Sequence, residues 1–362
     1  MLNILNLNMK EKKEGIKLAL LDTLRIKVKD LNVYKKTHKG WEKSDKLFPE
    51  AIEAIKLFKS NNNFKFLIDK ITPEFIKGQF YKGKCQGARI NILPDGKKLD
   101  KAYSLFAKNL TIHNENSNSH WDVIYQNPDR KYAYVYTLRK HNNAVKKKYN
   151  EVKDFKKYYH QIIKRAYSAL KNENDYLALP MYTLLETYMR VGNEIYYKAH
   201  GHKGLSTLKK SNIKIKGNNV TFNYLAKDGV PIKITKQFPE IYIKRLKKII
   251  NSTKNSDFIF TNSHGHPLQD IEFKEAFKHY CGKEFYPHIV RSFYATNKAE
   301  EFLKSHKSAT KEEIKDLFNS IAEKLGHKKF DKKSKEWKDN YNVTIHHYIQ
   351  PQVLDKIKAA IK

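Results

Sequence analysis

The spacing of apolar residues changes along the chain, and this change limits the possible folds. Between about residues 78 and 137, apolar residues occur in short runs rich in β-branched and aromatic side chains, which is typical of strands. From about residue 154 they recur every three or four positions, as in 155–170 and 181–200, which predicts amphipathic helices. We therefore predict an α+β protein, with a small β-rich N-terminal domain and a mainly helical domain that carries a β-hairpin insert.

Turn signals and charge runs divide the chain further. Asp228-Gly229 lies between two strand-like runs and predicts a hairpin, and the NPDR sequence at Asn127–Arg130 predicts another. Three domains are predicted: a basic, helical extension at 1–60, a β-rich domain at 61–145, and a mainly helical domain at 146–362, with an exposed Lys- and Asn-rich linker at 139–157. Within the helical domain, we expect further helices at 240–250, 270–280, 287–305 and 308–325, a Lys-rich loop at 328–340 and a short helix from about residue 347.

The charge balance indicates an anionic partner. Against 38 Asp and Glu the chain carries 71 Lys and Arg, a formal net charge of +33. With 40% hydrophobic residues the chain can still bury a core, so the charge does not indicate disorder. Nucleic acid is the leading partner for such an excess of positive charge. A membrane is the weaker interpretation, because the sequence has no run of eighteen apolar residues and its start lacks the features of a secretory signal.

Cysteine usage excludes several other classes. The two cysteines, Cys85 and Cys281, have no CxxC neighbour and cannot build a disulfide framework or a thiolate zinc site. We therefore expect an intracellular protein without a cysteine-bound metal centre.

Arginine is rare in this chain, and its positions are informative. Only 8 of the 71 basic residues are Arg, so most generic positive charges are Lys. Arg190 precedes Gly192, where backbone can approach a ligand, and Arg291 follows His288 by three residues, which places both side chains on one helix face. A guanidinium binds a phosphate through two parallel hydrogen bonds, which an ammonium cannot do.

Three further positions gain meaning from their order. Lys227 precedes the Asp228-Gly229 turn, His327 follows a helix-ending glycine, and Tyr348 lies near the end of the sequence in YIQPQVL. Taken singly, each has an ordinary structural explanation, such as a solvated turn lysine or a helix cap. Arg, hairpin Lys, His-x-x-Arg, Gly-His and a late Tyr are, however, the order found in one enzyme superfamily.

The chain resembles the tyrosine recombinase and type IB DNA topoisomerase superfamily. MRVGNEIYY, GLSTLKKSNIKI, FNYLAKDGVPIKI and YIQPQVL look like the corresponding segments of poxvirus-type and bacterial type IB topoisomerases, and the likeness covers about residues 165–362. It implies Tyr348 as the nucleophile that forms a 3′-phosphotyrosyl bond, Arg190 and Arg291 as phosphate clamps, Lys227 as general acid and His327 as a hydrogen-bond partner of a non-bridging oxygen. It also implies double-stranded DNA as partner, a monomer that acts as a clamp, and relaxation without metal or nucleotide.

Other residues are expected to contact DNA. His288 lies where recombinases carry a histidine and some viral topoisomerases a lysine. Lys209 and Lys210 follow the GLSTL segment, and Arg130 and Tyr136 belong to WDVIYQNPDRKYAYVY, which weakly resembles the N-terminal domain of the same enzymes.

One departure from the pattern leaves alternatives open. His327 and Tyr348 are 348 − 327 = 21 residues apart, further than in the relatives, and the excess is about the length of 328–340. The insertion is either a surface excursion, or His346 or His347 has replaced His327. Tyr341 is a rival nucleophile inside the insert.

Two other functions compete with a topoisomerase. A tyrosine recombinase or integrase would use the same chemistry to exchange strands between duplexes. A non-catalytic DNA-binding protein would account for the charge, but it would not account for the ordered Arg, Lys, His, Arg, His and Tyr residues.

Overall fold

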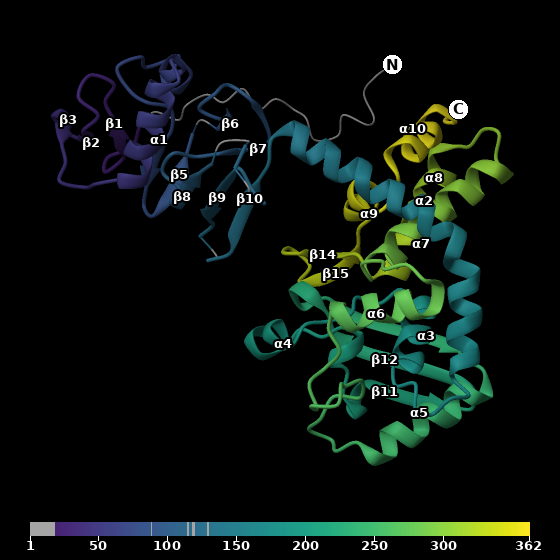
Figure 1. Ribbon diagram of the computed structural model, residues 1–362. Helices are drawn as coiled ribbons and strands as arrows, with labels where there is room; N and C mark the ends of the chain where they lie inside the picture. The colour runs from purple at the N-terminus through teal and green to yellow at the C-terminus, as the bar shows by residue number, and fades with distance from the viewer. Residues whose placement is uncertain (1–18, 88, 114–115, 118–119, 129) are drawn as a thin grey trace. The chain divides into compact units, whose positions relative to one another are not determined.

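The computed structural model describes residues 19–87, 89–113, 116–117, 120–128 and 130–362. The chain divides into two compact units, Met1–Lys146 and Lys147–Lys362 (Figure 1). Small antiparallel sheets dominate the first unit and helices dominate the second, as expected for an α+β protein. Within the described residues, no helix is long and apolar enough to cross a membrane.

The first unit contains ten strands and one long helix among its described residues. A five-stranded sheet has the order β3-β2-β1-β4-β5, a three-stranded sheet has the order β10-β9-β8, and β6 pairs with β7. The bounds are β1 Leu24–Ile26, β2 Val33–Thr37, β3 Gly40–Lys43, β4 Gln79–Tyr81, β5 Lys84–Gln86, β6 Ile90–Ile92, β7 Lys98–Tyr103, β8 Lys108–Ile112, β9 Val123–Gln126, β10 Tyr132–Val135, helix α1 Pro49–Ser60 and the 3-10 turn η1 Phe64–Leu67.

One apolar core holds this unit together. Helix α1 buries Ala51, Ala54, Ile55 and Phe58, whose spacing forms one face, against strand residues such as Ile26. A buried ion pair between Arg25 and Asp69 at 2.6 Å crosses the same region. Since each charge is desolvated, the pair is compatible with burial only because it is hydrogen-bonded.

The predicted helical extension at 1–60 is wrong where the structure describes it. Residues 24–43 form three strands that pair through β1 with β4, so they belong to the sheet of the first unit. The exposed positions of these strands include lysines. The segment therefore has a basic composition, and its strand pattern is difficult to recognise in the sequence. Helix α1 does form as its periodicity indicates, whereas residues 1–18 lie outside the described residues.

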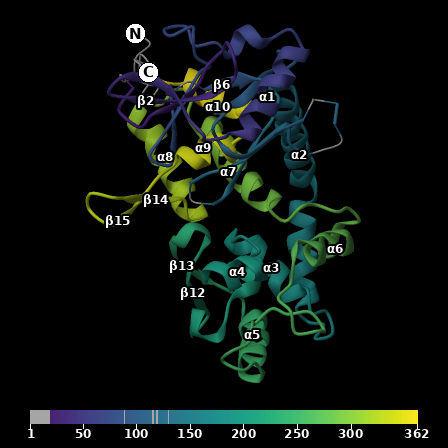
Figure 2. The same ribbon diagram turned by 90° about the vertical axis from the view of Figure 1, so that its left-hand side faces the viewer.

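The second unit is mainly helical. Its helices are α2 Leu138–Ala169, which begins in the first unit, α3 Ala178–Thr187, α4 Glu194–His200, α5 Glu240–Ser252, α6 Asp270–Cys281, α7 Ile289–Ser305, α8 Lys311–Leu325, α9 Asn342–His347 and α10 Pro351–Ala359, with 3-10 turns η2 Leu205–Thr207, η3 Lys210–Asn212 and η4 Lys227–Gly229. Its strands are β11 Ile213–Lys216, β12 Asn219–Leu225, β13 Pro231–Gln237, β14 Lys328–Asp331 and β15 Glu336–Asp339. In both views the sheet β11-β12-β13 lies toward one end of the unit, and α8, α9 and α10 gather toward the other (Figures 1 and 2).

The predicted linker at 139–157 is instead part of α2. This 32-residue helix buries Tyr149, Val152, Phe155, Ile162 and Ala166, which recur at helical spacing, while its lysines form the solvated face. The Phe155 ring lies 5.4 Å from that of Phe293 on α7, and burial of such a ring contributes about 1.5–3 kcal/mol. The apolar stripe was present in the sequence but was masked by the density of Lys and Asn.

Three other expected elements differ from the structure. Residues 181–200 form two helices, because Tyr188 adopts a left-handed conformation (φ 57°) and the chain is extended up to Asn193. The hairpin insert is a three-stranded sheet, since β11 joins β12 and β13. The expected Lys-rich loop at 328–340 is largely the hairpin β14-β15.

Candidate active site

The extended segment between α3 and α4 presents Arg190. Leu205 N–H donates to Arg190 O at 2.8 Å, so this segment pairs with the η2 turn. Gly192 has φ +105°, and a Cβ on Gly204 would lie 2.6 Å from Arg190 O. Both glycines are therefore required for the close approach of the two segments, which fixes the backbone under Arg190.

Arg291, on the first turn of α7, is buried and its guanidinium is tied to backbone. Its Nη1 donates to Tyr188 O at 2.6 Å, and its Nη2 donates to Leu325 O at 2.8 Å and to His327 Nε2 at 3.1 Å. Its exposed fraction is 3%, and its Nε has no hydrogen-bond partner. A guanidinium fixed in this way in a buried position can bind an anion.

His327 follows the helix α8, which ends at Gly326 in a left-handed conformation (φ 66°). Because a guanidinium can only donate, Nε2 of His327 accepts the hydrogen bond from Arg291, and Nδ1–H donates to Thr344 Oγ1 at 2.8 Å. Burial, and then the nearby charges of Arg291 and Arg190, lower the pKa of His327 to about 3. The ring is therefore neutral at pH 7.

Tyr348 lies between α9 and α10 and is 3% exposed. Its hydroxyl accepts from Arg190 Nη2 at 3.0 Å and lies 3.0 Å from His288 Nε2. Burial, followed by the charges of Arg291 and Arg190, lowers the pKa of His288 to about 3. Because the Tyr348 oxygen accepts from Arg190, its O–H is free to donate to Nε2 of His288 in the tautomer that carries the ring proton on Nδ1.

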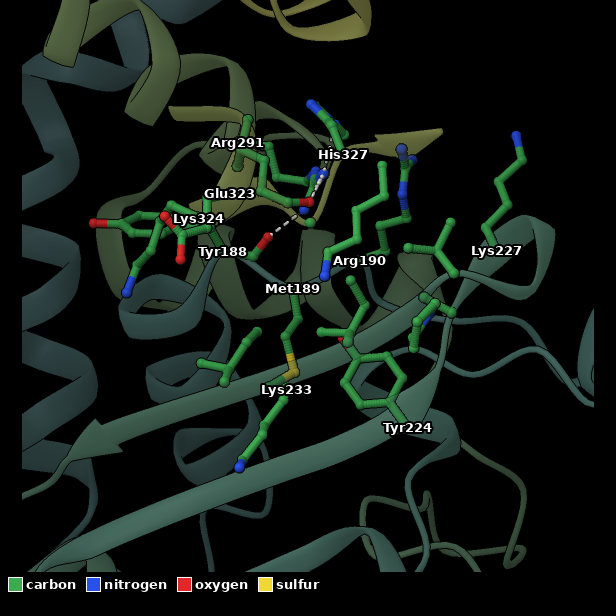
Figure 3. Close-up of a pocket in the computed structure, with 18 of the residues that line it drawn as sticks. Tyr188, Met189, Arg190, Tyr224, Lys227, Lys233, Arg291, Glu323, Lys324 and His327 are labelled. Atoms are coloured by element: carbon green, nitrogen blue, oxygen red, sulfur yellow. Dashed lines mark hydrogen bonds between the residues drawn. The ribbon is translucent and has the colours of Figure 1, made fainter. Parts of the chain in front are cut away.

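The structure brings five of the predicted site residues together, and Lys227 lies apart from them. Tyr348 contacts Arg190 and His288 directly, its ring centroid is 4.7 Å from that of His327, and the guanidinium carbon of Arg291 is 5.2 Å from it. Lys227 lies at the exposed turn between β12 and β13, and Figure 3 shows it standing apart from Arg190 and His327.

Two adjoining cavities meet at this cluster. One has a volume of about 550 Å³, and the other about 450 Å³. Arg190, Lys227 and Arg291 line both, while His327 lines the first and His288 the second. Cationic side chains outnumber the carboxylates of Asp228, Glu323 and Asp270 in these linings, so an anionic group can be held beside Arg190 and Arg291. Within the described residues, no group of three or more His, Cys, Asp or Glu could hold a metal ion.

Within the described residues, the hydrogen bond from the Arg190 guanidinium goes to Tyr348 and not to the alternative histidines or the alternative tyrosine. His346 and His347 are exposed, although His347 also lines the larger cavity. Tyr341 packs against Phe318, with ring centroids 5.8 Å apart. The hydroxyl that Arg190 contacts belongs to Tyr348, and the excess length between His327 and Tyr348 is accommodated by the hairpin β14-β15.

The predicted DNA contacts outside this cluster are dispersed. Lys209 and Lys210 are half-buried beside η3, and Lys209 Nζ lies 5.3 Å from the centroid of the Tyr197 ring. Arg130 and Tyr136 belong to the first unit, where Arg130 is exposed and Tyr136 is half-buried with its ring beside that of His120.

Sequence reasoning missed three residues that form hydrogen bonds with the backbone around Tyr348. Lys148 Nζ donates to His347 O and lies 5.4 Å from the centroid of the Tyr348 ring, and burial lowers the pKa of Lys148 to about 8. Tyr149 Oη donates to Ile349 O at 2.8 Å. Thr344 O accepts from Tyr348 N–H at 2.9 Å. Lys148 is one lysine in a basic run, so no sequence signal distinguished it.

The depressed histidine pKa values predict a loss of stability in mild acid. Unfolded histidine takes up a proton near pH 6.5, whereas folded His327 does so only near pH 3, so the unfolded state gains stability as pH falls through this window. From pH 7 to pH 5 this costs about 2 kcal/mol for one such histidine. Urea unfolding at both pH values should therefore show a smaller acid-induced loss in His327→Asn than in the unsubstituted protein. An equal loss in both proteins would contradict burial of a neutral His327.

Comparison with known proteins identifies relatives of the second unit. The family model described as eukaryotic DNA topoisomerase I, catalytic core, matches residues 137–353. DNA topoisomerase 1B of Acanthamoeba polyphaga mimivirus is 21% identical over 211 residues, which are 54% of this chain and 62% of that relative. The match thus spans less than two thirds of the relative's length.

Two complexes of one enzyme are among the solved structures to which the chain is similar. The XerH site-specific recombinase bound to difH substrate, in a pre-cleavage complex, is 15% identical, with a TM-score of 0.35 over 56% of this chain and 52% of that chain. Its post-cleavage complex with palindromic difH is 16% identical, with a TM-score of 0.36 over 56% and 50% of the two chains.

Proposed function

The chain belongs to the eukaryotic DNA topoisomerase I catalytic-core family, and on this premise we propose that it is a type IB DNA topoisomerase. It would relax supercoiled double-stranded DNA by cutting one strand, allowing the duplex to swivel, and resealing the cut. The observation that carries this proposal is the Tyr348 hydroxyl, 3.0 Å from both Arg190 Nη2 and His288 Nε2 and next to buried Arg291.

In the proposed cleavage step, Tyr348 Oη attacks the scissile phosphorus. The bond between phosphorus and Oη forms as the bond to the 5′ oxygen breaks, and the product is a 3′-phosphotyrosyl linkage. The phenolic proton passes to Nε2 of His288, whose lowered pKa rises when the phosphate brings negative charge beside the ring. Arg190 and Arg291 stabilise the charge that develops on the non-bridging oxygens.

The departing 5′ oxygen needs a proton, and Lys227 is the proposed donor. Its place at an exposed hairpin turn supports this role, since a turn can move toward a bound duplex without disturbing the buried cluster. Resealing is the reverse reaction. The 5′ hydroxyl attacks the phosphotyrosyl phosphorus, Tyr348 leaves as the phenol, and the linkage conserves the bond energy without a nucleotide.

A relaxation assay on supercoiled plasmid tests the proposal. We expect relaxation of both positive and negative supercoils in EDTA and without ATP, because side-chain cations stabilise the charge on the phosphate at this site. Strict dependence on magnesium or ATP would contradict type IB chemistry. Strand exchange between two duplexes without net relaxation would instead favour the recombinase alternative.

The hairpin β14-β15 is proposed to add affinity rather than chemistry. Its tip carries Lys332, Lys333 and Lys335, all exposed, and Lys335 has φ 54°. We expect the triple variant Lys332→Ala, Lys333→Ala and Lys335→Asn to keep the single-turnover cleavage rate, with Asn chosen because it tolerates this conformation. The slope of log affinity against log salt concentration should decrease in magnitude by about one to three. An unchanged slope would show that the tip does not contact phosphates.

A further inference from the structure

Side chains from two helices hold the turn that carries Tyr348. Three consecutive carbonyls of this turn each accept a hydrogen bond from a side chain outside it: from Lys148 Nζ to His347 O, from Thr296 Oγ1 to Tyr348 O at 3.2 Å, and from Tyr149 Oη to Ile349 O at 2.8 Å. Two of the donors are adjacent on α2 and the third is on α7. The turn is thus fixed from both sides.

This support matters because helix α9 fixes only the N–H of Tyr348, through Thr344 O. Helix α9 ends at His347 and α10 begins at Pro351, so the carbonyls between them lack partners from a continuing helix. A rotation of the turn would swing the Tyr348 hydroxyl away from Arg190, because the hydroxyl is at the far end of the side chain. Hydrogen bonds at the backbone therefore control where the hydroxyl lies.

The surroundings of Lys148 and Tyr149 favour their hydrogen bonds to this turn. Tyr149 is 6% exposed, so its hydroxyl is desolvated and needs the partner that Ile349 O provides. Lys148 is half-buried, and its ammonium contacts a backbone carbonyl while it lies 5.4 Å from the centroid of the Tyr348 ring. Among the described lysines it is one of few with a pKa lowered by burial, which indicates a committed rather than a solvated charge.

We propose that Lys148 and Tyr149 are positioning residues that hold Tyr348 in its attacking geometry. The proposal rests on the proposed function, in which Tyr348 is the nucleophile. Both residues act through the backbone on either side of Tyr348 and do not contact the scissile phosphate. Their loss should lower the rate of cleavage without lowering DNA affinity, since misplacement of a reacting atom by about 1 Å can cost about 100-fold in rate.

Single-turnover cleavage of a duplex whose cut product dissociates separates the rate from the affinity. We expect Tyr149→Phe to slow cleavage about tenfold and Lys148→Met about 10- to 100-fold, with the dissociation constant for the same duplex within about twofold of the unsubstituted value. Lys148→Arg keeps a charged donor and should recover most of the rate. The double variant should lose less than the product of the two single effects, because both residues hold one turn.

Matched controls remove the same groups elsewhere in the unit. Tyr280→Phe deletes a buried hydroxyl that donates to Asp175, and Lys156→Met deletes an α2 ammonium paired with Glu300. Cleavage rates of Tyr149→Phe and Lys148→Met equal to those of the controls would overturn the positioning proposal. A parallel loss of rate, affinity and melting temperature would also overturn it, in favour of a general structural role. If Tyr348→Phe still forms the covalent adduct, the proposed function fails instead.

Discussion

Replacing Tyr348 with phenylalanine should abolish both supercoil relaxation and the covalent protein–DNA adduct. The substitution removes only the hydroxyl that Arg190 and His288 contact at 3.0 Å. The ring remains in the core formed with residues such as Ile321 and Leu354, so the fold should lose only about 1 kcal/mol for the missing hydrogen bonds. DNA affinity should stay close to that of the unsubstituted protein, because the cationic residues of the site are intact.

Denaturing gels that retain a covalently linked oligonucleotide measure this directly. Tyr341→Phe is the matched control, since Tyr341 lies seven residues earlier and packs against Phe318 outside the cluster. It should form adduct at the unsubstituted level. Adduct in Tyr348→Phe together with its loss in Tyr341→Phe would move the nucleophile to Tyr341.

The residues of the site were accessible to sequence reasoning through their order along the chain, and three of them also stand at a local signal. Arg190 precedes Gly192, Lys227 precedes Asp228-Gly229, and His327 follows Gly326, and these glycines do adopt positive φ values. Such signals reflect local backbone chemistry, so they survive in a single sequence. Their order along the chain then predicted which residues would meet, and the structure brings all of them except Lys227 into one cluster.

The support behind the site was not predictable from local pattern. Lys148 and Tyr149 reach the turn of Tyr348 across about 200 positions of sequence. A contact between residues so far apart depends on how α2 packs, and α2 itself was mistaken for a linker because lysines fill its solvated face. The same masking hid strand β2 of residues 24–43, where Lys35 and Lys36 follow one buried valine.

The proposed role of His327 requires a proton on Nε2, whereas in the structure Nε2 accepts a hydrogen bond. In the unliganded cluster Nε2 accepts from Arg291 and Nδ1–H is held by Thr344, so the ring has no proton to offer a phosphate. Positive neighbours and burial are what lower the pKa of this histidine. We expect a bound phosphodiester to bring negative charge beside the ring and raise its pKa, so that Nε2 can carry a proton toward a non-bridging oxygen.

His327→Ala should therefore slow single-turnover cleavage by about 10²–10³-fold, the usual effect of losing one preorganised donor to the transition state. His327→Gln keeps a neutral donor and should retain more of the rate than the alanine variant. His346→Ala, an exposed neighbour of the same turn, should cleave at the unsubstituted rate. A large loss in His347→Ala combined with a near-normal His327→Ala would instead mean that the hairpin β14-β15 has shifted the histidine function to His347, which also lines the larger cavity.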